Sequence, residues 1–84
     1  MYEWLDQAAQ RLCSGVNDDP ALYRFGSGEV DEILDLARVA AHDGGHKTNA
    51  PLLSYLVGLA RGRHPELGLA EAIALALPER GEAD

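Results

Sequence analysis

Apolar residues recur along most of this chain at the three- and four-residue spacing of an amphipathic helix, and no stretch alternates convincingly with period two. Alanine and leucine dominate, whereas the β-branched and aromatic residues that favour strands are sparse. We therefore expect an all-α, compact, four-helix bundle-like single domain at residues 1–78. A flexible charged C-terminal tail is expected at residues 79–84.

Helix boundaries follow from the positions of glycine, proline and capping residues. Three of the expected helices cover residues 2–14, 29–42 and 69–77, and another begins after residue 48 or 49 and is closed by residues 61–65. Gly15 is a plausible end for the first helix and Ser27 a plausible N-cap for the second. Between them, Pro20 follows an acidic cap, which predicts a short extra helical turn in the first connection. Thr48 or Asn49 is expected to cap the third helix.

Each helix has an expected buried surface. The first has one apolar stripe, and the second has a continuous apolar face opposite the acids of its first turn. The third is apolar around nearly its whole circumference, which predicts that the other helices or a second chain cover it. Ser54, Gly58 and Gly62 recur every four residues, which favours close packing against a neighbouring helix. The fourth should turn Leu69 and Ile73 inward.

Composition narrows the classes of partner. Seven basic residues against 14 acidic ones give a net charge of −7, which argues against duplex nucleic acid or an anionic membrane as a partner. The longest apolar run, residues 50–60, has 11 residues, well short of the roughly 20 that span a bilayer. The single cysteine, Cys13, allows no intramolecular disulfide, and the N-terminus lacks the positive charge of a signal peptide. We therefore expect a cytoplasmic protein.

Charged side chains on the second helix form the main candidate for chemistry. Asp31, Asp35, Arg38 and His42 share one face of that helix. They form either a solvated surface, with Asp35 and Arg38 paired at i, i+3, or a ligand-binding stripe. His42 and His46 have a metal-ligand spacing, but the two glycines between them should end the helix, so no metal site is expected. No catalytic residue and no cofactor are expected either.

The aromatic residues allow two interpretations. Trp4 and Tyr55 are expected to pack in or beside the core, because that is where large aromatics are most often found. Alternatively, Trp4, Tyr55, or Tyr23 and Phe25 of the first connection anchor a protein partner, because aromatics concentrate in binding hot spots.

Three blocks of the sequence carry a family resemblance. Trp4 and Leu5 are followed by DLARVAAH at residues 35–42 and APLLSYLVGLA at residues 50–60. In this order the blocks resemble a small actinobacterial domain family of unknown function. Its members often carry the description molybdopterin-guanine dinucleotide biosynthesis protein, because the domain lies beside or is fused to the guanylyltransferase of that pathway. The family tends to place an arginine within residues 44–48, where Lys47 is the nearest cation here.

The resemblance implies a context for function. The leading hypothesis is a non-enzymatic interaction module that docks on the molybdenum-cofactor guanylyltransferase. The first alternative is a site for an anionic pterin or nucleotide phosphate, formed by Arg38, His42 and Lys47. The second is a homodimer without a ligand.

Overall fold

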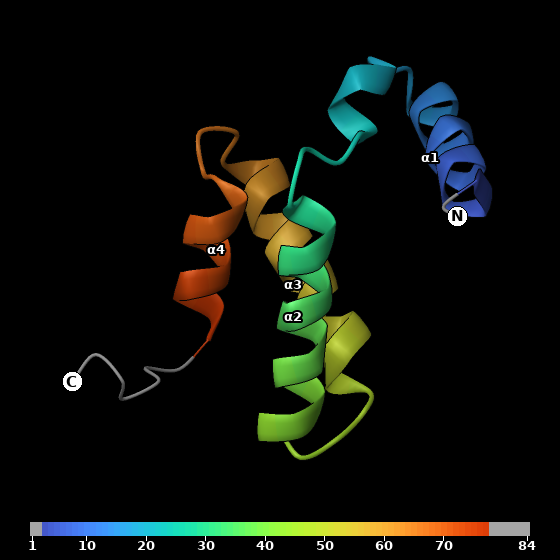
Figure 1. The fold of residues 1–84 in the computed structure, drawn as a ribbon. Coiled ribbons are helices and arrows are strands. Elements are labelled where there is room, and N and C mark those ends of the chain that lie inside the picture. Colours follow the sequence, from blue (N-terminus) through green and yellow to red (C-terminus); the bar gives the residue numbers. More distant parts are fainter. Residues whose placement is uncertain (1–2, 78–84) are drawn as a thin grey trace.

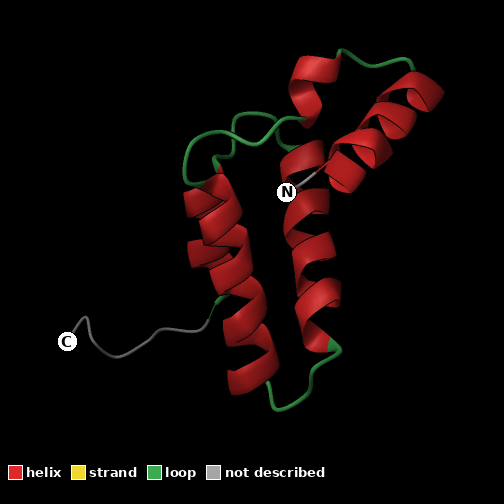
Figure 2. Cartoon of the chain, turned by 45° about the vertical axis from the view of Figure 1, so that its right-hand side comes forward, coloured by secondary structure: helices red, strands yellow, loops and turns green. Residues whose placement is uncertain are grey.

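The computed structural model describes residues 3–77, which fold into four α-helices and one short 3-10 helix (Figures 1 and 2). The elements in chain order are α1 (Glu3–Val16), η1 (Pro20–Tyr23), α2 (Glu29–Asp43), α3 (Asn49–Arg63) and α4 (Leu69–Ala76). No strand occurs between residues 3 and 77. The all-α class, the four helices and the extra turn are confirmed. The expected tail at residues 79–84 lies outside the described residues.

The end of α1 lies beyond the predicted stop. The helix passes through Gly15 and ends at Val16, so the prediction that Gly15 stops it is wrong. Asn17 adopts a left-handed conformation with φ of 66°, and the Asp18 N–H donates to the Cys13 carbonyl over 2.9 Å. Asparagine tolerates this conformation better than most residues, so the helix continues past the predicted stop and ends just before Asn17. The short helix η1 then begins as predicted, with the Asp19 carboxylate accepting from the Ala21 N–H.

Backbone conformation rather than a serine cap starts α2. The N-cap residue is Gly28, with φ of 83°, and the prediction for Ser27 is wrong. The backbone at this position has a positive φ, which glycine adopts readily because it has no Cβ atom. The Glu29 carboxylate accepts from the Gly26 N–H over 2.6 Å and so satisfies a donor ahead of the helix. At the start of α3, Thr48 occupies the N-cap position as one of the two predicted residues, but its side chain makes no capping bond.

The core lies between α2, α3 and α4. Its buried members are contributed by all three helices: Leu36, Val57, Leu69 and Ala72. The α4 prediction is confirmed for Leu69, and Ile73 packs against this cluster. The Arg61 guanidinium donates to the Leu67 carbonyl, which fastens the connection between α3 and α4. This core is small, because a few residues from three helices form it.

Helix α1 lies at one end of the molecule. Among the described helices it makes close backbone contacts only with η1, and Figures 1 and 2 both show these two elements set apart from the α2–α4 unit. Cys13 is buried on the side of α1 that faces η1. In the stripe predicted to be buried, Ala8 and Ala9 are half-buried, whereas Leu5, Leu12 and Val16 are exposed. That part of the prediction is wrong, because no helix packs closely on the stripe.

The surface of α3 also differs from the expectation. Val57 is its one buried residue and Leu53 packs half-buried against the core, whereas four large side chains are exposed: Leu52, Tyr55, Leu56 and Leu59. The remaining helices of this chain therefore do not cover α3 all round, and a second chain is the alternative left. The close packing predicted for Ser54, Gly58 and Gly62 is wrong as well. A Cβ added at Gly58 or Gly62 would meet no atom within 4 Å.

Candidate functional site

Two open apolar surfaces distinguish this fold from a closed bundle. The first is a cleft between α1, η1 and the core helices, which we name the α1–η1 cleft. The second is the outward side of α3 with the adjoining part of α4, which we name the α3–α4 face. The α3–α4 face comprises Leu52, Tyr55, Leu56, Leu59 and Leu75, all of which are exposed.

The α1–η1 cleft has a volume of about 290 Å³. The apolar stripe of α1 forms one wall, with Leu5 and Leu12 at the cleft, and Ile33 of α2 and Leu69 of α4 lie across from it. Phe25, from the connection after η1, contributes a further apolar side chain. The stripe of α1 thus faces apolar residues of the core helices but does not close onto them.

A larger hollow of about 640 Å³ adjoins this cleft and shares Leu22, Tyr23 and Phe25 with it. The small residues Ser54, Gly58 and Gly62 line this hollow, which explains why they meet no neighbouring helix. The Ser54 hydroxyl donates to the Ala50 carbonyl of its own helix over 2.8 Å, so its polar group is satisfied locally.

Carboxylates and guanidinium groups line the α1–η1 cleft in equal number, with Asp6 and Glu29 against Arg24 and Arg61. Asp18 lines the adjoining hollow together with Arg61. The Tyr23 hydroxyl donates to the Asp18 carboxylate over 2.7 Å. This bond, with smaller contributions from desolvation and from the negative charge of Asp18, raises the pKa of Tyr23 above 10.0.

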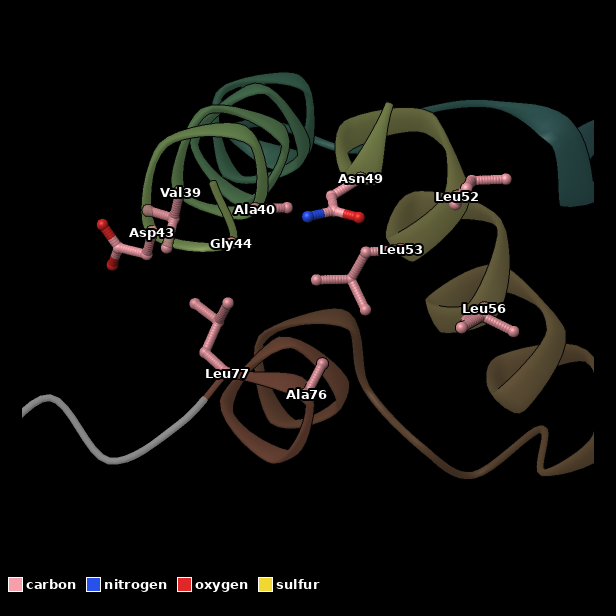
Figure 3. A pocket seen from close by; sticks show the side chains of 10 residues that line it. All are labelled: Val39, Ala40, Asp43, Gly44, Asn49, Leu52, Leu53, Leu56, Ala76 and Leu77. Carbon is pink, nitrogen blue, oxygen red and sulfur yellow. The ribbon is translucent and has the colours of Figure 1, made fainter. Parts of the chain in front are cut away.

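The α3–α4 face begins beside an apolar groove of about 320 Å³ (Figure 3). The groove lies where the end of α2, the first half of α3 and the end of α4 meet, and the Leu53 side chain points into it. Leu52 and Leu56 lie on its α3 wall. Leu56 also lines a neighbouring groove together with Leu75 of α4, so the apolar surface continues from one helix to the other.

The structure separates the aromatic residues predicted to anchor a partner. Tyr23 and Phe25 line the α1–η1 cleft, whereas Tyr55 lies on the α3–α4 face. Trp4 lies in the first turn of α1 and is 73% exposed. With Tyr55 at 69% exposure, the expectation that Trp4 and Tyr55 pack in or beside the core is wrong.

The three residues predicted to bind an anion, Arg38, His42 and Lys47, lie outside the groove shown in Figure 3. Arg38 donates to the Asp35 carboxylate, which confirms the i, i+3 ion pair. His42 Nδ1 lies 3.2 Å from the Asp43 carboxylate, and Lys47 is exposed in the connection between α2 and α3. None of the three predicted anion ligands lines the groove of Figure 3, although Asp43 does.

Metal ligands do not converge in the described part of the chain. Between residues 3 and 77, no group of three or more His, Cys, Asp or Glu side chains lies close enough to hold a metal ion. His46 Nδ1 instead lies 2.8 Å from the Thr48 hydroxyl. None of the helices described between these residues is both long enough and apolar enough to cross a bilayer.

Sequence reasoning missed the exposure of Leu75 and the involvement of Leu22. Leu75 lies on α4, where it is 75% exposed, and Leu22 lies on η1 beside the α1–η1 cleft. The position of Leu75 in its helix offered a signal, because it falls outside the stripe formed by Leu69, Ile73 and Ala76.

The fold and these surfaces define a small all-α domain that leaves two apolar surfaces open. The chain belongs to the family described as a domain of unknown function (DUF6457), whose model matches residues 1–82. Comparison with curated proteins and with solved structures gives no significant match.

Proposed function

We propose that this domain is a non-catalytic interaction module that binds a helix of another protein in the α1–η1 cleft. The observation that carries this proposal is the apolar stripe of α1, which faces Ile33 and Leu69 across an open cleft. An amphipathic helix laid into an apolar groove is a recurrent mode of protein recognition. A bound helix would bury Leu12, which is 60% exposed in the free chain.

Two further features support a helical ligand. Helix α1 packs closely only on η1, so it can adjust its distance from the core helices without breaking contacts between them. The small side chains at Ser54, Gly58 and Gly62 leave room for a backbone to approach the adjoining hollow.

We propose the molybdenum-cofactor guanylyltransferase as the partner. The resemblance of residues 35–42 and 50–60 to a domain found beside that enzyme supports this choice. The proposed binding element is an amphipathic helix on the surface of the guanylyltransferase, whose apolar face would enter the cleft. The role assigned to the domain is to dock on the enzyme, with no chemistry of its own.

Calorimetric titration of the domain with the purified guanylyltransferase tests the proposal. Leu12→Glu places a charge in the cleft and is expected to weaken binding by at least about tenfold. Leu34→Glu is the matched control, because Leu34 is similarly exposed on α2 but lies outside the cleft, and it should leave the affinity within about twofold. Absence of binding by the wild-type domain would refute the choice of partner. An equal loss in both variants would refute the cleft as the binding site.

An anionic ligand is the alternative proposal, and the geometry supports it less. Asp35 pairs with Arg38, and Asp43 lies beside His42, so each predicted anion ligand on α2 has a carboxylate neighbour. Arg38→Ala separates the two proposals. The interaction module predicts unchanged affinity for the guanylyltransferase, whereas the anion site predicts lost binding of a guanine nucleotide with little loss of stability.

A further inference from the structure

We infer that two copies of this chain form a symmetric dimer through the α3–α4 face. On α3 the exposed residues are Leu52, Tyr55, Leu56 and Leu59, which follow the i, i+3, i+4, i+7 spacing. At 3.6 residues per turn, they fall within an arc of about 100° on the side of α3 away from Val57. Such a stripe is the surface that a helix normally buries, yet no element between residues 3 and 77 covers it.

The stripe suits a second copy because it is self-complementary. In a two-fold symmetric pair with antiparallel α3 helices, Leu52 of each copy lies near Leu59 of the other. Tyr55 and Leu56 then meet near the symmetry axis. Self-complementarity of this kind is what an isologous dimer interface requires.

The exposed area is sufficient for a specific dimer. The five residues of the α3–α4 face range from 46% exposed at Leu59 to 75% exposed at Leu75. Their burial in both copies would remove on the order of 1,200 Å² of surface, which is at the lower end of the range for stable protein interfaces. The groove beside Leu52 gives the partner additional apolar surface to contact.

Charge also selects this face for contact between two copies. Each chain carries a net charge of −7, so two copies repel unless they meet where carboxylates are few. Helix α3 contains no acidic residue and α4 contains one, Glu71, whereas α2 alone contains five. The α3–α4 face is therefore the apolar surface on which two acidic chains can meet at the lowest electrostatic cost.

The ends of the face are complementary in charge. Arg63 ends α3, and Asp43 at the end of α2 lies across the groove from Leu52 of the first half of α3. The antiparallel arrangement brings Arg63 of each copy toward the groove that holds Asp43 of the other. This pairing fixes the antiparallel direction, because a parallel arrangement would place the two Arg63 residues together.

Sedimentation equilibrium of the full chain over about 1 to 500 µM tests the dimer. The wild-type chain is expected to show a reversible monomer–dimer equilibrium. Leu56→Glu should raise the dimer dissociation constant by at least about tenfold, because it buries two carboxylates near the symmetry axis. Leu34→Glu, which adds the same charge at a similarly exposed position on α2, should change it by less than about threefold.

Charge reversal tests the direction of the two helices. Arg63→Asp should weaken the dimer, and the addition of Asp43→Arg should recover most of the lost affinity. A strictly monomeric wild-type chain, or equal effects of Leu56→Glu and Leu34→Glu, would overturn the dimer. Failure of the double variant to recover affinity would overturn the antiparallel arrangement.

The dimer and the proposed function can fail separately, because they use different surfaces. Leu12→Glu should leave the dimer intact, and Leu56→Glu should leave binding of the guanylyltransferase intact. Circular dichroism and thermal unfolding of each variant show whether the helices still form. Loss of both activities in one folded variant would contradict the separation of the two surfaces.

Discussion

The protonation state of Tyr23 affects the stability of the connection between α1 and α2. Its hydroxyl donates to Asp18, so the neutral phenol is favoured and the pKa of Tyr23 lies above 10.0. Because the folded-state pKa is raised, the bond stabilises the fold at pH values below about 10. That contribution is lost as the pH rises through the raised pKa, where phenolate and carboxylate repel.

Asp18→Ala is therefore expected to lower the pH at which Tyr23 ionises. Titration of the phenolate absorbance of the folded chain measures this change. The part of the wild-type titration curve that disappears in Tyr23→Phe identifies the contribution of Tyr23. An unchanged titration curve in Asp18→Ala would show that the hydrogen bond does not persist in solution.

Spacing within a helix predicted some residue pairs correctly. The pair of Asp35 and Arg38 followed from their i, i+3 positions, because the helix geometry fixes their distance. The choice between Ser27 and Gly28 as the N-cap of α2 did not follow from spacing. It depends on the direction in which the chain arrives from η1, which requires a left-handed residue at Gly28.

Among the helices, α2 shows the contrast between a core position and a surface position. Leu36 is 1% exposed, whereas Leu34, two residues earlier, is 57% exposed. Leu36→Ala is expected to lower the free energy of unfolding by about 2–5 kcal/mol, because it leaves a cavity in the core. Leu34→Ala should lower it by less than about 1 kcal/mol. Urea unfolding of both variants measures the difference, and equal losses would contradict this placement of the core.

The positions of the helices were predictable from sequence, but the surfaces that pack against each helix were not. Periodicity and punctuation placed α2, α3 and α4 to within a few residues, because these signals are local. Which surface covers an apolar stripe is set by long-range packing. For this reason the stripe at Leu5 and Leu12 was expected to be buried, although it faces an open cleft. The same limit applies to the candidate site, where Tyr23 and Phe25 were predicted but Leu22 was not.

For the whole molecule, net charge and apolar surface oppose one another. Two copies with a charge of −7 each repel over long distances, whereas an ion pair such as Arg63 with Asp43 attracts only at short range. Salt shortens the reach of this repulsion to about 8–10 Å near physiological ionic strength. The dimer dissociation constant should therefore decrease as sodium chloride is raised from about 0.01 to 0.15 M.

Sedimentation equilibrium across this salt range measures the change. Leu56→Glu provides the control and should remain largely monomeric throughout. A dissociation constant that increases with salt would contradict the prediction, and would show that ion pairs outweigh the repulsion between the two chains.

Because Cys13 is buried, the rate at which its thiol is labelled reports movement of α1. The thiol is 2% exposed, lies on the side of α1 that faces η1, and is the single cysteine of the chain. A thiol reagent can reach the sulfur only when α1 and η1 separate, so the labelling rate reports how often they part. A guanylyltransferase helix bound against α1 would lower the labelling rate of Cys13. Dimer formation through the distant α3–α4 face would leave this rate unchanged.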